Sequence, residues 1–142
     1  MARPEPFTFP VDVRYLEVDR QGVVFNMWYL AYFDDAMTAF LAAGGLPYGA
    51  MLGSGVDVQV VHTEIDWFGP LGFGEAAVVS VAVAHVGRTS FALRFDVRTA
   101  GRAVAGGRSV YVAVRTDGSG KVDLPPALRA ALGPAPAPSA TS

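Results

Sequence analysis

The chain lacks cysteine and has only two histidines, His62 and His85, among its 142 residues. Without cysteine there are no disulfides, no thiol nucleophiles and no thiolate-bound metals. Two histidines alone are too few for a typical zinc site, and both lie in strand-like segments where structural histidines are common. The sequence therefore predicts no metal and no cofactor, and its chemistry must depend on carboxylates, hydroxyls and backbone dipoles.

Long apolar runs without a charge are also missing. None reaches the 18 or so residues of a membrane-spanning helix, and the first ten residues lack the apolar centre of a signal peptide. We therefore expect a cytoplasmic protein that does not insert into membranes. The hydrophobic content of 51% with 17% charged residues is typical of a globular protein, and the length predicts one domain.

The net charge of −2 is distributed unevenly along the chain. Residues 1–74 carry three basic and nine acidic side chains, net −6, whereas residues 75–142 carry eight basic and four acidic ones, net +4. This balance argues against a nucleic-acid partner. The basic half would suit a small anionic ligand, but a solvated sheet face has the same composition.

The longest apolar segment, residues 27–43, predicts the helix on which the other elements pack. Its only strongly polar side chains are Asp34, Asp35 and Thr38, so nearly every face of the helix is apolar and should be buried. Residues 44–45, two glycines, are expected to end it.

A tight turn precedes this helix. Gly22 can adopt the positive φ that directs the chain from Asp19 towards the helix N-terminus. We therefore expect Asp19 to lie near unpaired backbone N–H groups.

Segments with alternating or valine-rich apolar residues predict antiparallel strands on either side of the helix. The first, from Phe7, is expected to end near Asp19. In residues 56–67 the apolar alternation shifts by one position, which indicates a bulge or a change of which face is buried. Three further strands, residues 76–86, 89–99 and 102–115, form a meander, with a second bulge expected at Gly106–Gly107. The predicted fold is α+β, with a curved antiparallel sheet of about five strands around one long central helix.

Short helices are expected within residues 47–55 and 125–132. We predict a single domain over residues 1–132, followed by a flexible tail rich in proline and alanine at residues 133–142.

Residues 13–36, VRYLEVDRQGVVFNMWYLAYFDDA, resemble the signature of the hotdog-fold acyl-CoA thioesterases of the 4-hydroxybenzoyl-CoA thioesterase type, near the YbgC-like branch. The similarity extends over about residues 8–116. It implies hydrolysis of an acyl-CoA thioester by a homodimer or homotetramer. The residues at the spacing of the family pattern D-x-x-G-V-V-x-x-x-x-Y-x-x-Y are Asp19, Gly22, Val23, Val24, Tyr29 and Tyr32.

The resemblance implies that Asp19 is the catalytic carboxylate, acting as nucleophile or as base for water, although an aspartate in such a turn is often only structural. It also implies that the backbone N–H near Asn26 polarises the thioester carbonyl. Asn26 stands where the YbgC-like branch commonly has histidine. Its side chain cannot act as an acid or base, but it can cap the helix.

The acyl group is expected to contact the turn and the first turns of the helix. Tyr29 and Tyr32 have core packing as the alternative role. Trp28 would either line an aromatic pocket with Phe25 or fill it. Asp34 stands where the 4-hydroxybenzoyl enzymes recognise a ring hydroxyl, although other thioesterases of this fold have an acidic residue there too. The full predicted set is Gly22, Val23, Val24, Phe25, Trp28, Tyr29, Tyr32 and Asp34.

Arg88, Thr89 and Ser90 form the turn that in related enzymes contacts the nucleotide of coenzyme A. Arginine binds phosphate through a bidentate fork, but Arg88 could equally be a solvated hairpin residue. Two alternative functions stay open, namely release of an acyl or polyketide chain from an acyl carrier protein and acyl-CoA binding without turnover. A dehydratase is disfavoured because neither histidine lies in a suitable motif.

Overall fold

The computed structural model describes residues 3–134 and 136, so most of the tail predicted at residues 133–142 lies outside the described residues. Each predicted helix and strand is present, and the largest change in bounds is the early end of the first strand. The elements in chain order are β1 (Phe7–Asp12), the 3-10 turn η1 (Tyr15–Glu17), α1 (Trp28–Ala43), α2 (Tyr48–Gly53), β2 (Val56–Trp67), β3 (Ala76–Val86), β4 (Ser90–Thr99), β5 (Arg102–Arg115) and α3 (Pro126–Leu132).

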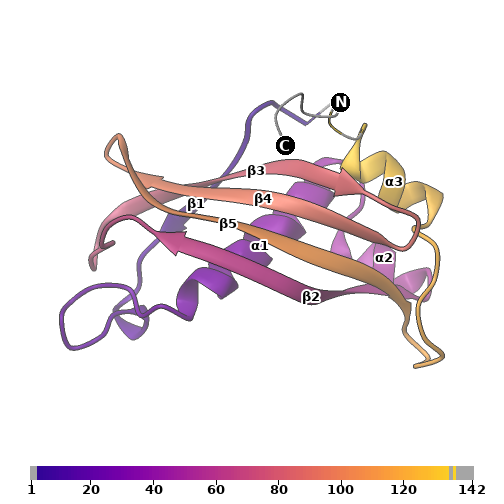
Figure 1. The fold of residues 1–142 in the computed structure, drawn as a ribbon, viewed down its shortest axis with the longest axis horizontal. Coiled ribbons are helices and arrows are strands. Elements are labelled where there is room, and N and C mark those ends of the chain that lie inside the picture. Colours follow the sequence, from indigo (N-terminus) through magenta and orange to yellow (C-terminus); the bar gives the residue numbers. More distant parts are fainter. Residues whose placement is uncertain (1–2, 135, 137–142) are drawn as a thin grey trace.

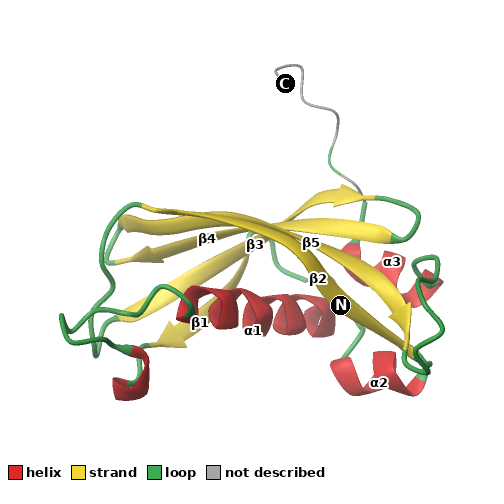
Figure 2. Cartoon of the chain, turned by 60° about the horizontal axis from the view of Figure 1, so that its bottom comes forward, coloured by secondary structure: helices red, strands yellow, loops and turns green. Residues whose placement is uncertain are grey.

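The five strands form one antiparallel sheet in the order β1-β3-β4-β5-β2. Figure 1 shows α1 crossing behind the sheet, and Figure 2 shows the sheet curving over it. This arrangement confirms the predicted α+β fold with a curved sheet around one long helix. The strands β1 and β2 are the two edges of the sheet.

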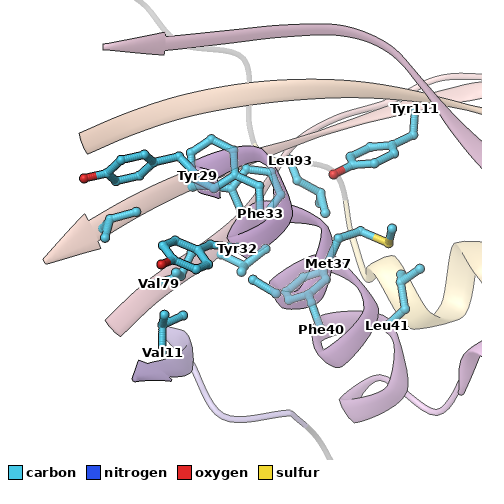
Figure 3. Close-up of a cluster of buried hydrophobic side chains, with 14 of the residues drawn as sticks. Val11, Tyr29, Tyr32, Phe33, Met37, Phe40, Leu41, Val79, Leu93 and Tyr111 are labelled. Carbon is cyan, nitrogen blue, oxygen red and sulfur yellow. The ribbon is translucent and has the colours of Figure 1, made fainter. Parts of the chain in front are cut away.

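The core lies between α1 and the concave face of the sheet. In Figure 3 the labelled α1 side chains lie among Val79, Leu93 and Tyr111 of the strands. Phe33 stacks on Phe95 of β4 with ring centroids 4.5 Å apart. The α1 residues buried in this layer are Tyr29, Tyr32, Phe33, Ala36, Met37, Phe40 and Leu41.

The expectation that nearly every face of α1 is buried is wrong within one chain. Leu30 is 47% exposed, and Asp34 and Asp35 are exposed too. The physical reason is that a single sheet covers a helix from one side only.

The first strand is shorter than the alternation predicted. It ends at Asp12, well before Asp19, and the chain then turns through η1. The turn is favoured because the Glu17 carboxylate accepts a hydrogen bond from the Arg14 backbone N–H at 2.9 Å, which diverts the chain from the sheet. As a result Tyr15 does not continue the buried face of the strand and is exposed.

One of the two predicted bulges is present. The β2–β5 register shifts between Val60 and His62, as the parity change indicated. The bulge predicted at Gly106–Gly107 is wrong, because both glycines pair regularly with β2. Gly107 is instead required by packing, since the ring of Phe33 fills the space beside its Cα.

Within residues 3–134 and 136, no helix is both long enough and apolar enough to cross a membrane.

Candidate active site

Residues 17–25 form a small hairpin that presents Asp19. The Asp19 N–H donates to the Val23 carbonyl at 2.9 Å, and the Gly22 N–H donates to the Asp19 carbonyl at 3.0 Å. Gly22 has φ +78°, a conformation that side chains disfavour, so the predicted tight turn is confirmed. The hairpin is joined to the loop after β2, since the Val24 N–H donates to the Leu71 carbonyl at 2.8 Å.

The Asp19 side chain faces an open cavity of about 670 Å³. Its Oδ1 accepts the Gln21 N–H at 2.8 Å, and its second oxygen has no hydrogen-bond partner in the part of the chain that the structure describes. An exposed carboxylate with one free oxygen is suited to attack a carbonyl or to take a proton from water. The cavity is lined by Tyr15, Val18, Asp19, Arg20, Gly22 and Phe73.

Two aromatic residues of this cavity were not predicted from the sequence. Tyr15 lies within the span predicted for the first strand, and Phe73 lies in a glycine-rich loop for which the sequence predicts no site residue. Their rings meet edge to face with centroids 5.8 Å apart. The signal that marks Phe73 is a large aromatic residue flanked by glycines, Gly72 and Gly74, where packing does not require one.

The N-terminus of α1 leaves backbone donors unpaired at the end of the hairpin. The N–H groups of Trp28 and Tyr29 already donate to the carbonyls of Phe25 and Asn26. For the N–H groups of Asn26 and Met27, no acceptor is found among residues 3–134 and 136. Such donors, together with the positive end of the helix dipole, stabilise negative charge on an oxygen.

The predicted helix cap by the Asn26 side chain is wrong. Met27 occupies the cap position, and no side-chain hydrogen bond caps the helix. The first turn is closed by backbone carbonyls instead, with Trp28 donating to Phe25 at 3.0 Å.

Asp34 lies in a second cavity, of about 550 Å³, between α1 and β2. Although Asp34 is exposed as a residue, the cavity walls partly desolvate its carboxyl group and raise its pKa, and the neighbouring charges of Asp35 and Asp57 raise it further. Within one chain this cavity shares no lining residue with the cavity at Asp19. Its lining consists of Leu30, Ala31, Phe33, Asp34, Val60, Val61, His62, Thr63, Ser109 and Tyr111.

The two signature tyrosines are buried core residues. Tyr29 packs edge to face against Tyr32 and against Trp67 of β2. The Tyr32 hydroxyl donates to Glu17 Oε1 at 2.8 Å, and burial raises the pKa of both phenols. Contact of either tyrosine with substrate stays a prediction.

The other predicted acyl contacts differ in exposure. Phe25 is exposed and Trp28 is half-buried against the core, whereas Val24 is buried and does not line the cavity at Asp19. Val23 is half-buried and pairs with Gly72.

Arg88, Thr89 and Ser90 lie far from Asp19 in the same chain. Asp12, which precedes the Asp19 hairpin, pairs with Ala76 at the start of β3, and Arg88 follows the far end of this 11-residue strand. At about 3.4 Å per residue, β3 separates the two regions by roughly 35 Å. The exposed Arg88 guanidinium binds Asp123 at 3.2 Å. One site that uses both Asp19 and Arg88 would therefore require two chains.

Comparison with known proteins agrees with this architecture. Residues 13–132 match the family model of the thioesterase-like superfamily. A crystal structure of a hypothetical protein from Aquifex aeolicus superposes with a TM-score of 0.86 and 26% identity, over 90% of this chain and 100% of that one. The superposition supports the predicted hotdog fold.

Two curated proteins are similar in sequence. A "Putative esterase" of Aquifex aeolicus is 27% identical over 110 residues, which cover 78% of this chain and 86% of that protein. The "Putative acyl-CoA thioesterase YneP" of Bacillus subtilis is 38% identical over 69 residues, about half of each chain. Because the family model spans most of the chain, this protein belongs to the thioesterase-like superfamily.

Proposed function

We propose that the protein hydrolyses an acyl-CoA thioester to the free acid and coenzyme A, with Asp19 as the catalytic carboxylate. The observation that carries this proposal is that a carboxylate faces an open cavity at the same end of the molecule as the N–H groups of Asn26 and Met27, and that one carboxylate oxygen and both N–H groups have no partner among the described residues. Membership of the superfamily and the similarity to YneP support the substrate class.

In this reaction Asp19 either attacks the thioester carbonyl carbon, forming a mixed anhydride that water then hydrolyses, or removes a proton from the water that attacks the thioester. Negative charge develops on the carbonyl oxygen in both routes, and the N–H groups of Asn26 and Met27 would stabilise it there. The leaving group is the thiolate of coenzyme A, which needs little protonation. One carboxylate and backbone donors are therefore sufficient, and no acid or base is required of Asn26.

The active unit that we propose is a homodimer joined along β2. This edge strand has 12 residues and pairs only with β5 among the described strands. Val60 and Val61 are 50% and 56% exposed on it, and they border the Asp34 cavity together with Leu30 of α1. A second copy at this edge would cover the apolar residues and protect the open edge.

Free coenzyme A release from short, medium, long and aromatic acyl-CoAs tests the proposal. Asp19→Asn should lower kcat at least about a hundredfold. The matched control is Asp117→Asn, because Asp117 accepts the Ser119 N–H at 2.8 Å in a similar turn away from the site. Full activity of Asp19→Asn would refute the assignment, and binding without coenzyme A release by the wild type would favour a non-catalytic protein.

A further inference from the structure

We propose that the buried hydrogen-bonded pair of Glu17 and Tyr32, here called the lock, positions the Asp19 hairpin on helix α1. Glu17 acts through Asp19 and the start of α1, so it is a positioning residue and does not touch the substrate. The inference rests on the proposed catalytic role of Asp19.

Both oxygens of Glu17 are hydrogen-bonded although the residue is only 4% exposed. Oε1 accepts the Tyr32 hydroxyl at 2.8 Å and the Arg14 backbone N–H at 2.9 Å. Oε2 accepts Arg14 Nε at 2.9 Å. Burial by itself would raise the pKa of Glu17, but these donors outweigh it and the pKa lies below its ordinary value. The carboxylate is therefore ionised at neutral pH.

The backbone of Glu17 closes the base of the hairpin that leads into the same helix. Its carbonyl accepts the Phe25 N–H at 2.9 Å, and the Phe25 carbonyl accepts the N–H of Trp28, the first residue of α1. Tyr32 lies one helical turn further along. The hairpin thus contacts α1 at two points, through the Glu17 side chain at Tyr32 and through the Phe25 carbonyl at Trp28, while its turn carries Asp19.

Two attachment points fix the orientation of the hairpin, which a single contact would leave free to rotate. A buried ionised carboxylate is a poor source of stability alone, because apolar residues of similar volume often give an equally stable core. Its hydrogen bonds are directional, however, and a misplacement of about 1 Å in a catalytic group lowers the rate strongly. The geometry therefore favours a role in positioning.

Two substitutions test the lock without changing its shape. Tyr32→Phe removes only the hydroxyl, and Glu17→Gln removes the charge. Each should lower kcat for acyl-CoA hydrolysis at least about tenfold and leave KM within about twofold, because the position of Asp19 changes while neither Glu17 nor Tyr32 lines the cavity at Asp19 or the cavity at Asp34. Amide hydrogen exchange at Asp19 and Phe25 should become faster in both variants.

Tyr48→Phe is the matched control. It also removes a tyrosine–carboxylate hydrogen bond, that of Tyr48 with Asp57 at 3.1 Å, but at the start of α2, beyond the other end of α1. Neither kcat nor exchange at Asp19 should change in this variant. The double variant of Glu17 and Tyr32 should lose less activity than the product of the two single losses, because both changes weaken the same hydrogen bond, whereas only Glu17→Gln removes the charge that pairs with Arg14.

A lower melting temperature with unchanged kcat and unchanged exchange in Tyr32→Phe and Glu17→Gln would overturn the lock, since Glu17 would then be merely structural. Asp19→Asn is assayed beside them to separate the two proposals. If Asp19→Asn keeps full activity, the proposed function fails. Amide exchange then decides the lock alone, with faster exchange supporting it and unchanged exchange rejecting it.

Discussion

The ring of Phe33 occupies the space that a side chain on Gly107 would need. A Cβ added to Gly107 would lie 2.7 Å from Cε2 of Phe33 and 2.6 Å from the Glu64 backbone carbonyl. Neither neighbour can move easily, because Phe33 is stacked on Phe95 and the carbonyl belongs to the paired strand β2. Gly107→Ala should therefore lower the free energy of unfolding by about 1–3 kcal/mol, as overpacking of a core does. Denaturant unfolding measures the change.

The control for this prediction is Gly49→Ala, because Gly49 lies in α2 and an added Cβ would meet nothing within 4 Å. Alanine is the better helix former, so this variant should be neutral or up to about 1 kcal/mol more stable. Equal effects of the two substitutions would show that the contact of Phe33 with Gly107 is not what limits residue size there.

The elements of the fold could be predicted because their signals are local. Apolar alternation and the glycine pair after α1 depend on neighbouring residues, and they located the helices and strands, except for the end of the first strand. The packing role of Gly107 could not be predicted in this way. Glycine is required there by the ring of Phe33 in α1, 74 residues earlier in the chain, whereas the sequence of the paired glycines suggested a bulge.

The candidate site was predicted only in part for the same reason. The motif spacing predicts Asp19 as the catalytic carboxylate, which stays a prediction, and the tight turn at Gly22, a local feature that is confirmed. It gave no sign that the Glu17 side chain bonds Tyr32, because that contact depends on how α1 packs. Nor could it show that Asp19 and Arg88 lie at opposite ends of one chain, since a list of matched residues contains no distances.

The stability contribution of Asp34 should depend on pH. Burial and the charges of Asp35 and Asp57 raise its pKa, so the folded protein binds this proton more tightly than the unfolded chain does. The ionised form is thus unfavourable at neutral pH, and the stability from the bound proton is fully present only below the ordinary aspartate value of about 3.9. Asp34→Asn should raise the melting temperature at pH 7, and this gain should disappear as the pH falls to about 4.

The stability contribution of Asp117 should depend on pH in the opposite direction to that of Asp34. Hydrogen bonds from Ser119 lower its pKa, so its carboxylate stabilises the fold above the ordinary aspartate pKa and loses this effect in acid. Asp117→Asn should therefore lower the melting temperature slightly at pH 7 and not in acid. Calorimetry across the pH range checks both variants, and a pH-independent gain for Asp34→Asn would show that ionisation is not its cause.

Arg88→Ala should weaken binding of acyl-CoA but not of a substrate truncated to acyl-pantetheine, which lacks the nucleotide phosphates. A charge-assisted hydrogen bond contributes about 1.5–3 kcal/mol, so KM for acyl-CoA should rise about tenfold or more. Arg94→Ala serves as the control, because Arg94 is exposed on the outer face of β4. A similar rise in KM for both substrates would remove Arg88 from the nucleotide site.

The final prediction concerns a pocket shared by two chains. Asp19 and Arg88 are separated by the length of β3 within one chain, so a site that contains both takes each from a different subunit. In a mixed dimer of Asp19→Asn and Arg88→Ala chains, one site carries both defects and the other carries none. Random reassembly of equal amounts should restore about a quarter of the wild-type activity at a substrate concentration near the wild-type KM.

The mixture is prepared by unfolding and refolding together the two variants, which carry different tags. Sedimentation at assay concentration verifies the dimer. If each site belonged to one chain, the mixture would show only the high-KM activity of Arg88→Ala, and a fully active monomer would exclude a shared pocket.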